Sequence, residues 1–518
     1  MRSFLSIAGF ALLLDQVHCH INSLDVPKPL KDSRPVSRDF QSFSIEFAFF
    51  PDYAGNQSHP NKFSKNLLAN FESITGVFPK VRVGGTTQDK SNFFPDQEEG
   101  IKLFFQKATD DQPYQINYGP AFFESYHTLG NINFFHGLNM NQNSSMEQLA
   151  EAAIVACQSI GPQLELFELG NEWNYAAKNY RPGNYSELDY TQEWNRKSAF
   201  VHAAVKKACP GLSPGFMAPS FVLLDDTDSS GWTAEELYNL GYDPNDLTRE
   251  LSFHNYMGAN APPNPPAARQ LQGMQHTQIH IPIILFLSAL TKTETLMNHT
   301  NIVSNLDAQI KRSNELAYLG HPYTLGELNS MANQGIDGVT NVFGDALWLV
   351  DFSLWSAANN IERLHFHQGL NYRYASWQPI TSEGEPPATR PPYYGQIMVA
   401  SAIGHSEDTR VVNIPLSEDT ESAYAIYNGD KLRKIAVVNM RAYNATNTES
   451  RPNREYKFRV AGIHHARVER LTAPGSESLE NVTFGGVSYD YSRKGGMPFV
   501  IDKIEENLVV ESGILSVD

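Results

Sequence analysis

Cysteine is scarce in this chain of 518 residues, which contains only Cys19, Cys157 and Cys209. Three cysteines are too few for the disulfide framework that small secreted domains need. Cys157 and Cys209 either pair in one disulfide or stay as two buried thiols, and the sequence does not decide between them. Zinc-binding Cys/His spacings, P-loops and dinucleotide fingerprints are also missing, so we expect no metal and no cofactor.

Positive charge is in short supply as well. The chain has 40 Lys and Arg against 57 Asp and Glu, a formal net charge of −17 at pH 7 and an isoelectric point of about 5.4. Such a surface repels phosphates and anionic headgroups, which argues against nucleic acid, membranes and polyanionic polymers as partners. The composition is otherwise that of an ordinary globular protein with a large core.

Long hydrophobic runs are absent beyond the N-terminus, where no stretch approaches the ~18 apolar residues of a transmembrane helix. The N-terminus itself combines Arg2, the apolar run Phe4–Leu14, and Val17 and Cys19 at the −3 and −1 positions of a cleavage site. Residues 1–19 are therefore predicted to be a signal peptide rather than a buried first helix. We expect a secreted, extracellular protein.

Glycosylation sequons fit this prediction of export. Sequons also occur by chance, but together with a signal peptide they are typical of a secreted eukaryotic glycoprotein. The six acceptor asparagines are Asn56, Asn143, Asn184, Asn298, Asn444 and Asn481.

Short apolar strands alternate with amphipathic helical patterns between residues 43 and 404. Eight strands in such an alternation are the count of a (β/α)8 TIM barrel, and the alternative is a doubly wound open sheet. The eight strand candidates are "FSIEFAFF" (43–50), "KVRVGG" (80–85), "INFFHGLN" (132–139), "LELFELGNE" (164–172), "GFMAPS" (215–220), "LSFHNY" (251–256), "YTLGE" (323–327) and "RLHFH" (363–367).

The pattern changes after the Pro-rich stretch at residues 383–392. Asn428–Gly429 lies between two strand-like runs, which is a strong hairpin signal. Alternating apolar residues continue to the C-terminus, so residues 405–518 are predicted to form a β-sandwich domain. We expect this domain to pack against the barrel and to take no part in catalysis.

Two carboxylates occupy equivalent places in the predicted barrel. Glu172, in "GNEWN", ends the fourth strand, and Glu327, in "GELNS", ends the seventh. Side chains at the C-terminal ends of barrel strands converge on one mouth, where the active site lies. A pair of carboxylates facing each other there is what glycosidic bond cleavage requires, because one donates a proton and the other attacks or activates water.

These motifs, in this order, resemble glycoside hydrolase family 79, which includes fungal and bacterial β-glucuronidases and heparanase. The resemblance also rests on "VRVGGTTQD" (81–89), "FHGLN" (135–139), "SFHNYMG" (252–258) and "FHQGLNY" (366–372). It covers nearly the whole mature chain and implies that residues 20–42 lend a strand to the C-terminal β-domain.

The resemblance also implies roles for individual residues. Glu172 matches the general acid/base of the family and Glu327 its nucleophile. Asn171 matches the amide that holds the sugar 2-hydroxyl, and Tyr256 matches a tyrosine that hydrogen-bonds the nucleophile. The alternatives are a capping role for Asn171 and simple packing for Tyr256.

Recognition of a uronic acid is implied by a second group. Tyr372 and the backbone amides of the turn that begins at Gly369 resemble the element that binds the uronic acid carboxylate. Heparanase has a second glycine where this chain has Leu370, which leaves the direction of that amide open. The alternative for Tyr372 is that its ring lines the site without contacting the carboxylate.

Two further carboxylates are candidate substrate contacts. Glu46 lies on the first predicted strand, and Asp89 either meets substrate or forms a structural ion pair with Arg82. His136 and His254 are expected to be hydrogen-bonded core residues rather than catalysts.

Charge separates the activities within the family. An endo-acting heparanase must hold a highly sulfated chain, and this acidic sequence offers no comparable basic cluster. We therefore predict a monomeric retaining exo-β-glucuronidase that acts on glycans with terminal glucuronic acid, including its 4-O-methylated form. The alternatives are a retaining β-glycosidase for neutral sugars, an endo-β-glucuronidase of the heparanase type, and a catalytically inactive carbohydrate-binding relative.

Overall fold

The computed structural model describes residues 23–31, 33–107, 109–141, 145–212, 214–223, 231–260, 296–502 and 505–518. The predicted signal peptide and the sequon at Asn143 lie outside the described residues. Within these ranges, no helix has the length and apolar character needed to cross a bilayer.

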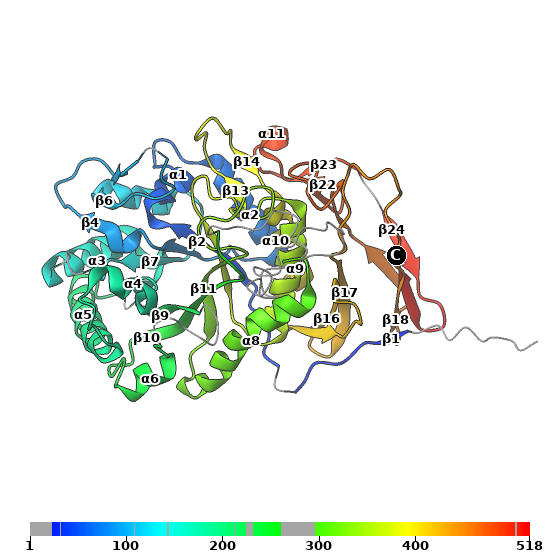
Figure 1. Cartoon of the computed structure of the whole chain (residues 1–518), viewed down its shortest axis with the longest axis horizontal. Coiled ribbons are helices and arrows are strands. Elements are labelled where there is room, and N and C mark those ends of the chain that lie inside the picture. Colours follow the sequence, from blue (N-terminus) through cyan, green and yellow to red (C-terminus); the bar gives the residue numbers. More distant parts are fainter. Residues whose placement is uncertain are drawn as a thin grey trace, which may run out of the picture. The chain divides into compact units, whose positions relative to one another are not determined.

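Eight parallel strands close into a barrel, as the alternation of strands and helices predicts (Figure 1). Each strand pairs in parallel with its two neighbours, and β12 returns to pair with β2. Closure excludes the doubly wound open sheet. In order around the barrel the strands are β2 (Gln41–Glu46), β3 (Val81–Gly84), β7 (Phe134–Leu138), β8 (Leu164–Leu169), β9 (Gly215–Leu223), β10 (Thr248–Tyr256), β11 (Tyr323–Asn329) and β12 (Leu364–Gln368).

The first strand is shorter than predicted. The run "FSIEFAFF" leaves the sheet at Glu46, and its second half forms the 3-10 helix η1 (Phe47–Phe49) and the start of helix α1 (Phe50–Ala54). A short apolar run does not distinguish strand from helix by its pattern, because all of its side chains are buried in either case. Pro51 in the first turn of α1 favours the helix.

Helices surround the barrel strands (Figure 1). The N-terminus of α5 has a capping box, in which Ser186 and Asp189 satisfy each other's backbone amides. The longer helices are α2 (Lys62–Thr75), α3 (Met146–Ile160), α5 (Glu187–Ala208), α8 (His299–Glu315), α9 (Phe343–Ala358) and α10 (Pro391–Ile403). The shorter ones are α4 (Trp173–Tyr180), α6 (Ala234–Asn239), α11 (Tyr491–Lys494), η2 (Gln88–Lys90), η3 (Pro120–His127), η4 (Gly161–Gln163) and η6 (Ala317–Leu319).

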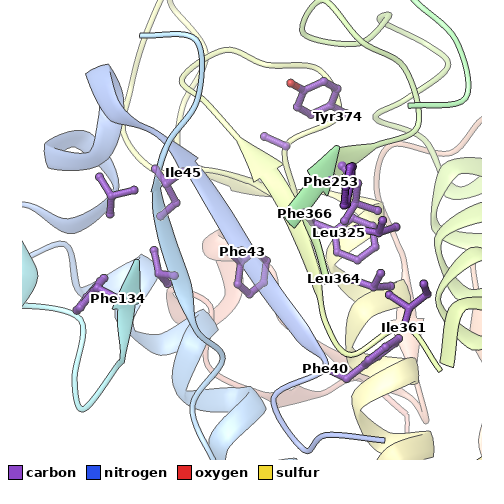
Figure 2. Close-up of a cluster of buried hydrophobic side chains, with 14 of the residues drawn as sticks. Phe40, Phe43, Ile45, Phe134, Phe253, Leu325, Ile361, Leu364, Phe366 and Tyr374 are labelled. Atoms are coloured by element: carbon purple, nitrogen blue, oxygen red, sulfur yellow. The ribbon is translucent and has the colours of Figure 1, made fainter. Parts of the chain in front are cut away.

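Aromatic and branched side chains fill the space between the strands and the helices (Figure 2). Phe43 of β2 is fully buried and packs edge-on against Phe71 of α2 and Trp377, with ring centroids 5.5 and 5.1 Å apart. Each fully buried phenylalanine of this kind stabilises the fold by about 1.5–3 kcal/mol. This packing fixes the strands that carry the site.

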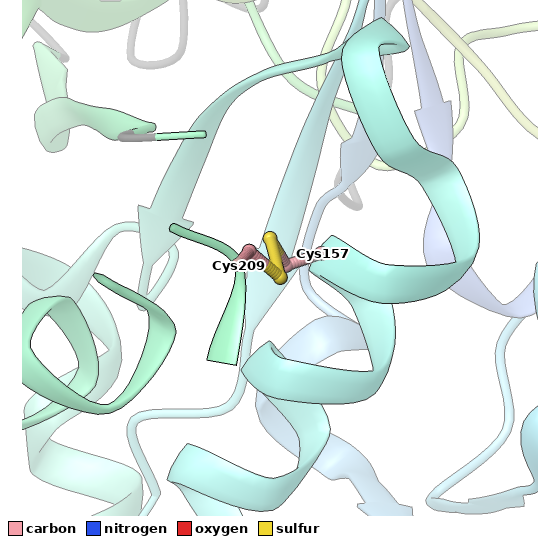
Figure 3. The surroundings of a disulfide bond; sticks show 2 residues. All are labelled: Cys157 and Cys209. Carbon is pink, nitrogen blue, oxygen red and sulfur yellow. A yellow bond between two sulfur atoms is a disulfide. The ribbon is translucent and has the colours of Figure 1, made fainter. Parts of the chain in front are cut away.

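Cys157 and Cys209 form a disulfide between α3 and the residue that follows α5 (Figure 3). The structure therefore decides between the two alternatives that the sequence leaves open. The bridge spans 52 residues. In the chain-entropy description, closing a loop of this size stabilises the folded state by about 4 kcal/mol.

A small sheet is inserted after β3. It contains β4 (Ser91–Phe93), β6 (Gln115–Tyr118) and β5 (Ile101–Phe104), in that order. The connection between β5 and β6 carries Asp111, which pairs with Arg373 after β12, and Gln112, which contacts Glu46 of β2.

Further strands follow the barrel. Strands β15 (Thr409–Ile414), β16 (Glu421–Asn428) and β17 (Lys431–Asn439) form an antiparallel sheet whose last two strands make the predicted hairpin. This sheet belongs to the same compact unit as the barrel, which comprises residues 27–451 and 469–505. The remaining short strands of this unit are β13 (Trp377–Gln378), β14 (Ala388–Thr389), β20 (Leu471–Thr472), β21 (Thr483–Phe484), β22 (Val487–Ser488) and β23 (Phe499–Val500).

A second compact unit contains strands from both ends of the chain. Strand β1 (Leu24–Asp25) pairs in parallel with β18 (Tyr456–Arg459), which pairs antiparallel with β25 (Ile514–Val517). Strands β19 (His465–Val468) and β24 (Glu506–Val509) form a separate pair. The N-terminal segment thus contributes a strand to a C-terminal sheet.

Candidate active site

Glu172 and Glu327 lie together at the C-terminal ends of β8 and β11. One oxygen of each carboxylate and a ring nitrogen of His254 all lie within 4.8 Å of one another. Retaining glycosidases hold their two carboxyl groups about 5–5.5 Å apart, whereas inverting enzymes separate them by about 6.5–9.5 Å. Nearest oxygens within 4.8 Å match the retaining class, in which one carboxylate attacks the sugar directly.

The chain turns sharply to present Glu172. Glu172 adopts the left-handed conformation, with φ 52°, and its amide donates to the carbonyl of Ser220 at 2.9 Å. A left-handed backbone is uncommon for a residue with a Cβ and is concentrated at functional sites. Oε1 of Glu172 lies 2.9 Å from Nδ1 of His254, and 17% of the Glu172 side chain is exposed.

Glu327 is more deeply buried and is surrounded by donors. Arg82 Nη1 donates to Oε2 at 2.6 Å, and the Tyr256 hydroxyl donates to Oε1 at 2.7 Å. His367 Nδ1 lies 3.7 Å from Oε2. A bulge in β10 before His254 sets this histidine directly opposite Glu327 in the β10–β11 register.

These neighbours control the charge of Glu327. Burial alone would raise the pKa of its carboxyl group, but the positive charges of His367, His254 and Arg82 and the Tyr256 hydrogen bond lower the pKa well below 4.5. Burial and the Glu327 charge raise the pKa of Tyr256 well above 10, so its hydroxyl remains a donor. Glu327 is therefore held as an ionised carboxylate.

Arg82 connects both ends of the site. It is fully buried on β3 and donates to Ser44, Glu168, Asn171 and Glu327, at distances of 2.6–2.9 Å. The expected alternative of an ion pair between Arg82 and Asp89 is wrong, because the guanidinium is occupied by these other groups.

Asp89 instead supports the turn that carries Glu172. Its carboxylate accepts from the amides of Met140 and Asn171, at 2.7 and 2.8 Å, and from Nε1 of Trp173 at 3.0 Å. Burial raises the pKa of Asp89 to about 6 against these hydrogen bonds. Asp89 is 1% exposed, and its hydrogen bonds connect it to the site through Asn171 and Trp173; direct contact with substrate stays a prediction.

Asn171 has one half of its amide engaged. Its carbonyl oxygen accepts from Arg82 Nη2 at 2.6 Å. This contact orients the side chain and leaves the NH2 group as the part suited to a sugar hydroxyl.

A second cluster contains the residues expected to recognise the sugar acid. The Tyr372 hydroxyl donates to Glu46 Oε2 at 3.3 Å and accepts from Gln112 Nε2 at 2.7 Å. His367 Nε2 lies 3.1 Å from the same Glu46 oxygen, and the Thr87 amide donates to the other at 2.8 Å. Burial lowers the pKa of His367, but the charges of Glu327 and Glu46 outweigh it and raise the pKa, so this ring supplies positive charge between two carboxylates.

The turn after β12 fits only in part the role expected of its backbone amides, which is to bind the uronic acid carboxylate. The Tyr372 ring packs on Gly369, where a Cβ would lie 2.3 Å from the ring. The Asn371 amide already donates to Gln378 Oε1 at 3.2 Å, so it is engaged within the protein. Arg373 points to Asp111, with contacts of 3.1–3.3 Å.

The sequence did not reveal that His254 and His367 lie beside the two glutamates, or that Gln112 joins the cluster around Glu46. His254 is fully buried and hydrogen-bonded, as expected of a core histidine, but its partner is Glu172, while His136 is buried against the Tyr126 hydroxyl at 2.6 Å. The strand alternation contains the missing signal, because His254 stands two residues before Tyr256 and therefore shares its face of β10. Gln112 carries no such signal, since it comes from an inserted connection.

The cluster of Glu172, His254 and Glu327 also has the residue types of a cation site. Among the described residues, Glu172, His254 and Glu327 are the group of acidic and histidine side chains close enough to share an ion. Both oxygens of Glu327 already accept hydrogen bonds, and Arg82 supplies the positive charge there. The arrangement suits proton transfer and nucleophilic attack better than metal binding.

A closed (β/α)8 barrel with two such carboxylates at the ends of its strands defines a glycoside hydrolase. Residues 423–518 match the glycosyl hydrolase family 79 C-terminal beta domain. The chain is 37% identical over 504 residues to a β-glucuronidase of Aspergillus niger, covering 92% of this chain and 88% of that protein. It is 32% identical over 548 residues to a β-glucuronidase of Neurospora crassa, covering 96% and 92% of the two chains. The chain therefore belongs to glycoside hydrolase family 79.

Solved structures share the fold. A 4-O-α-L-rhamnosyl-β-D-glucuronidase from Fusarium oxysporum 12S superposes with a TM-score of 0.74 at 21% identity, over 96% of this chain and 97% of that one. A family 51 arabinofuranosidase from Xanthomonas axonopodis pv. citri superposes with a TM-score of 0.56 at 14% identity, over 96% of each chain. At these identities the likeness concerns the architecture.

Proposed function

We propose that this chain is a retaining exo-β-glucuronidase, which hydrolyses terminal β-linked glucuronic acid, with or without a 4-O-methyl group, from glycans. The observation that carries the proposal is the pair Glu172 and Glu327, whose carboxylate oxygens approach within 4.8 Å. The two fungal relatives named β-glucuronidases support the choice of sugar.

In the first half of the reaction, Glu327 is the nucleophile and Glu172 the acid. A carboxylate oxygen of Glu327 bonds to C1 of the sugar while the bond from C1 to the leaving oxygen breaks. The electron pair of that bond stays on the leaving oxygen, which takes the proton of Glu172. The roles follow from the surroundings, because Glu327 is held ionised by Arg82 and Tyr256, while the hydrogen-bond partner of the Glu172 side chain among the described residues is His254 and Glu172 is more exposed.

In the second half, water opens the glycosyl ester. Glu172 takes a proton from the water, whose oxygen bonds to C1, and the electron pair of the ester bond returns to Glu327. Two displacements at C1 leave the β configuration of the substrate in the product.

Sugar recognition is assigned to the groups around this pair. The NH2 group of Asn171 is proposed to hold the 2-hydroxyl, where a hydrogen bond strengthens in the transition state. Glu46 is proposed to accept from a ring hydroxyl. The Tyr372 hydroxyl, which donates to Glu46 in the free protein, is proposed to turn and donate to the C6 carboxylate instead. The positive charge of His367 offsets Glu46, which otherwise would repel that carboxylate.

Exo action fits the inserted connection between β5 and β6. It brings Gln112 to Tyr372 and Glu46, and an ion pair between Asp111 and Arg373 fastens it. The net charge of −17 also disfavours an extended sulfated chain, so the endo-acting alternative is the weaker one.

Paired substrates test the proposal. We expect hydrolysis of p-nitrophenyl β-glucuronide, with the β-anomer appearing first in the proton NMR spectrum, and little hydrolysis of the β-glucoside. An initial α-anomer refutes double displacement, and preference for the glucoside makes the enzyme a glycosidase for neutral sugars.

Tyr372→Phe tests the contact with the acid group. A hydrogen bond to a charged group contributes about 1.5–3 kcal/mol, which corresponds to roughly 10- to 100-fold in kcat/KM on the glucuronide. The loss on the glucoside is expected to be much smaller. Tyr424→Phe is the matched control, because its hydroxyl also donates to a buried carboxylate, that of Asp351, but not at the site. Equal losses on both sugars assign Tyr372 to packing.

Secretion and glycosylation belong to the same proposal. The side chains of Asn56, Asn184, Asn444 and Asn481 are exposed, as glycan attachment requires, while Asn298 is half-buried and caps α8. Mass spectrometry of the protein from a culture medium, before and after enzymatic deglycosylation, is the measurement, and size-exclusion chromatography tests the expected monomer.

A further inference from the structure

Arg82 binds two carboxylates at once, and the reaction removes the charge of only one of them. Oε2 of Glu168 accepts from Nε at 2.7 Å and lies 2.6 Å from Nη2, while Oε2 of Glu327 accepts from Nη1 at 2.6 Å. The side chains of Arg82 and Glu168 are both fully buried. Water therefore does not screen the guanidinium, and its charge is balanced by these two carboxylates.

The charge balance changes when Glu327 reacts. In the free enzyme Arg82 faces two negative groups. In the glycosyl ester Glu327 is neutral, and the negative charge has moved to Glu172, which contacts His254 rather than Arg82. Glu168 is then the remaining carboxylate hydrogen-bonded to Arg82. A buried charge that loses its partner costs several kcal/mol, so this second carboxylate matters most in the intermediate.

We propose that Glu168 is a positioning residue that acts through Arg82: it is the permanent counter-ion that keeps the buried guanidinium compensated while Glu327 is esterified. This inference rests on the proposed function, in which Glu327 is the nucleophile. Glu168 takes no part in bond making, and it lowers the free energy of the covalent intermediate relative to the free enzyme.

The surroundings of Glu168 restrict it to this task. Its Oε1 has no hydrogen-bond partner among the described residues, and the same holds for Nε2 of His254, which lies 4.0 Å away. Among the described residues, Arg82 supplies both the hydrogen bond that Oε2 accepts from Nε and the 2.6 Å ion-pair contact with Nη2. Gly84 leaves room for the pair, because a Cβ there would lie 2.7 Å from Arg82 Nε and 2.8 Å from Glu168 Oε2.

A second buried arginine in the chain, Arg363, likewise forms hydrogen bonds with two carboxylates, and a third, that of Glu362, lies 3.9 Å away. Arg363 pairs with Glu250 at 2.7 and 3.0 Å and with Asp39 at 3.1 Å. Both carboxylates of this triad keep their charge throughout the proposed reaction. Glu250→Gln therefore removes an equivalent carboxylate from an equivalent buried arginine and serves as the matched control for Glu168→Gln.

The two half-reactions respond in opposite directions to Glu168→Gln. Esterification of Glu327 would leave Arg82 without a counter-ion, so formation of the intermediate becomes slower. Hydrolysis of the ester returns the charge to Glu327 and restores the pair, so breakdown of the intermediate becomes faster. A residue that only maintains the shape of the site would slow both steps.

A 2-deoxy-2-fluoro-β-glucuronyl fluoride separates the steps in the full-length enzyme, because it forms the ester and then releases it slowly. For Glu168→Gln we expect labelling to be about 10- to 100-fold slower and recovery of activity in buffer to be about threefold faster or more. Glu168→Asp keeps the carboxylate on a shorter side chain, so both of its rates should lie between those of wild type and Glu168→Gln. This variant decides the question if Glu168→Gln does not fold. Glu250→Gln is expected to leave both rates close to wild type.

Three outcomes overturn the inference. The first is a folded Glu168→Gln in which labelling and recovery of activity change in the same direction. The second is a Glu168→Asp whose rates do not lie between those of wild type and Glu168→Gln. The third is a Glu250→Gln with slower labelling and faster recovery. Peptide mass spectrometry of the labelled enzyme distinguishes failure of the inference about Glu168 from failure of the proposed function. If wild type is not labelled at Glu327, the proposed function fails and the inference falls with it, whereas labelling at Glu327 with parallel rates removes only the role of Glu168.

Discussion

The hydroxyl of Tyr256 donates a 2.7 Å hydrogen bond to Oε1 of Glu327. Arg82 occupies the other oxygen, so the nucleophile is held from both sides before substrate arrives. Such fixed donors reduce the reorganisation needed when the carboxylate attacks, and they keep it ionised in a buried place. The consequences of this contact can be measured.

Removing the Tyr256 hydroxyl is expected to slow the hydrolysis of every substrate to the same extent. Tyr256→Phe removes one hydrogen bond to a charged group, worth about 1.5–3 kcal/mol, so kcat/KM should fall roughly 10- to 100-fold on glucuronide and on glucoside. Steady-state kinetics on both p-nitrophenyl glycosides is the measurement. Tyr323→Phe, which loses a hydrogen bond to the neutral Gln309, is the control and should have little effect. A loss confined to the glucuronide would assign Tyr256 to sugar recognition instead.

The two glutamates should fail in different ways. Glu172→Ala removes proton donation, which matters little for an acidic leaving group, so activity on p-nitrophenyl glucuronide should exceed that on natural glycans by at least about tenfold. Azide is expected to enter the vacated space and yield the β-glycosyl azide. Glu327→Ala removes the covalent route, and its activity should drop by several orders of magnitude on all substrates. A β-linked azide product from Glu327→Ala would show that the roles are reversed.

The pH profile should extend far into the acid range. The pKa of Glu327 is lowered from its ordinary 4.5, because the charges of His367, His254 and Arg82 and the Tyr256 hydrogen bond outweigh burial. Glu327 therefore stays ionised as the pH falls below 4.5 and is protonated only at its lowered pKa. The acid limb of the profile therefore reports the ionisation of Glu327.

Tyr256→Phe provides the test of that assignment. Loss of a hydrogen bond to the ionised form raises the pKa of Glu327, so the acid limb of kcat/KM should move to higher pH while the alkaline limb stays in place. An acid limb that stays in place in Tyr256→Phe contradicts the assignment of that limb to Glu327.

His299 is expected to make stability depend on pH. Its Nδ1 lies 2.9 Å from Oδ2 of the buried Asp351, and although burial lowers the pKa of His299, the hydrogen bond and charge of Asp351 raise it above 6.5. A raised pKa stabilises the charged form. The stabilisation is therefore complete below pH 6.5 and is lost as the pH rises through the raised pKa.

Melting temperatures of His299→Asn and wild type check this expectation. The variant should be less stable by about 1.5–3 kcal/mol at pH 5.5, and the difference should shrink at pH 9. His321→Asn is the control, because His321 is equally exposed but faces the solvent-accessible Asp246 at 3.4 Å. Surface pairs of that kind contribute about 0–1 kcal/mol. A constant difference between pH 5.5 and pH 9 means that His299 acts by packing alone.

The sequence by itself determined the barrel and its two carboxylates. Eight apolar runs separated by helical patterns are typical of a closed barrel, in which both faces of every strand are buried. The structure has a barrel strand at each of the eight runs. Glu172 and Glu327 could be placed because strand ends in a barrel share one mouth, so their position along the chain fixes their position in space. The hairpin at Asn428–Gly429 is equally local, since a two-residue turn depends on its own backbone.

Only the tertiary structure decided which groups surround those carboxylates. Arg82 meets Glu168 and Glu327 because the non-adjacent strands β3, β8 and β11 bring these side chains together in the barrel. The periodicity within one strand holds no information about such contacts between strands. The same holds for the pairing of Cys157 with Cys209, which depends on how α3 and α5 lie side by side. Gln112 reaches Tyr372 from an inserted connection whose path is set by packing rather than by a repeating pattern. Charge compensation in a buried site is a property of neighbours in space, and the sequence orders only neighbours along the chain.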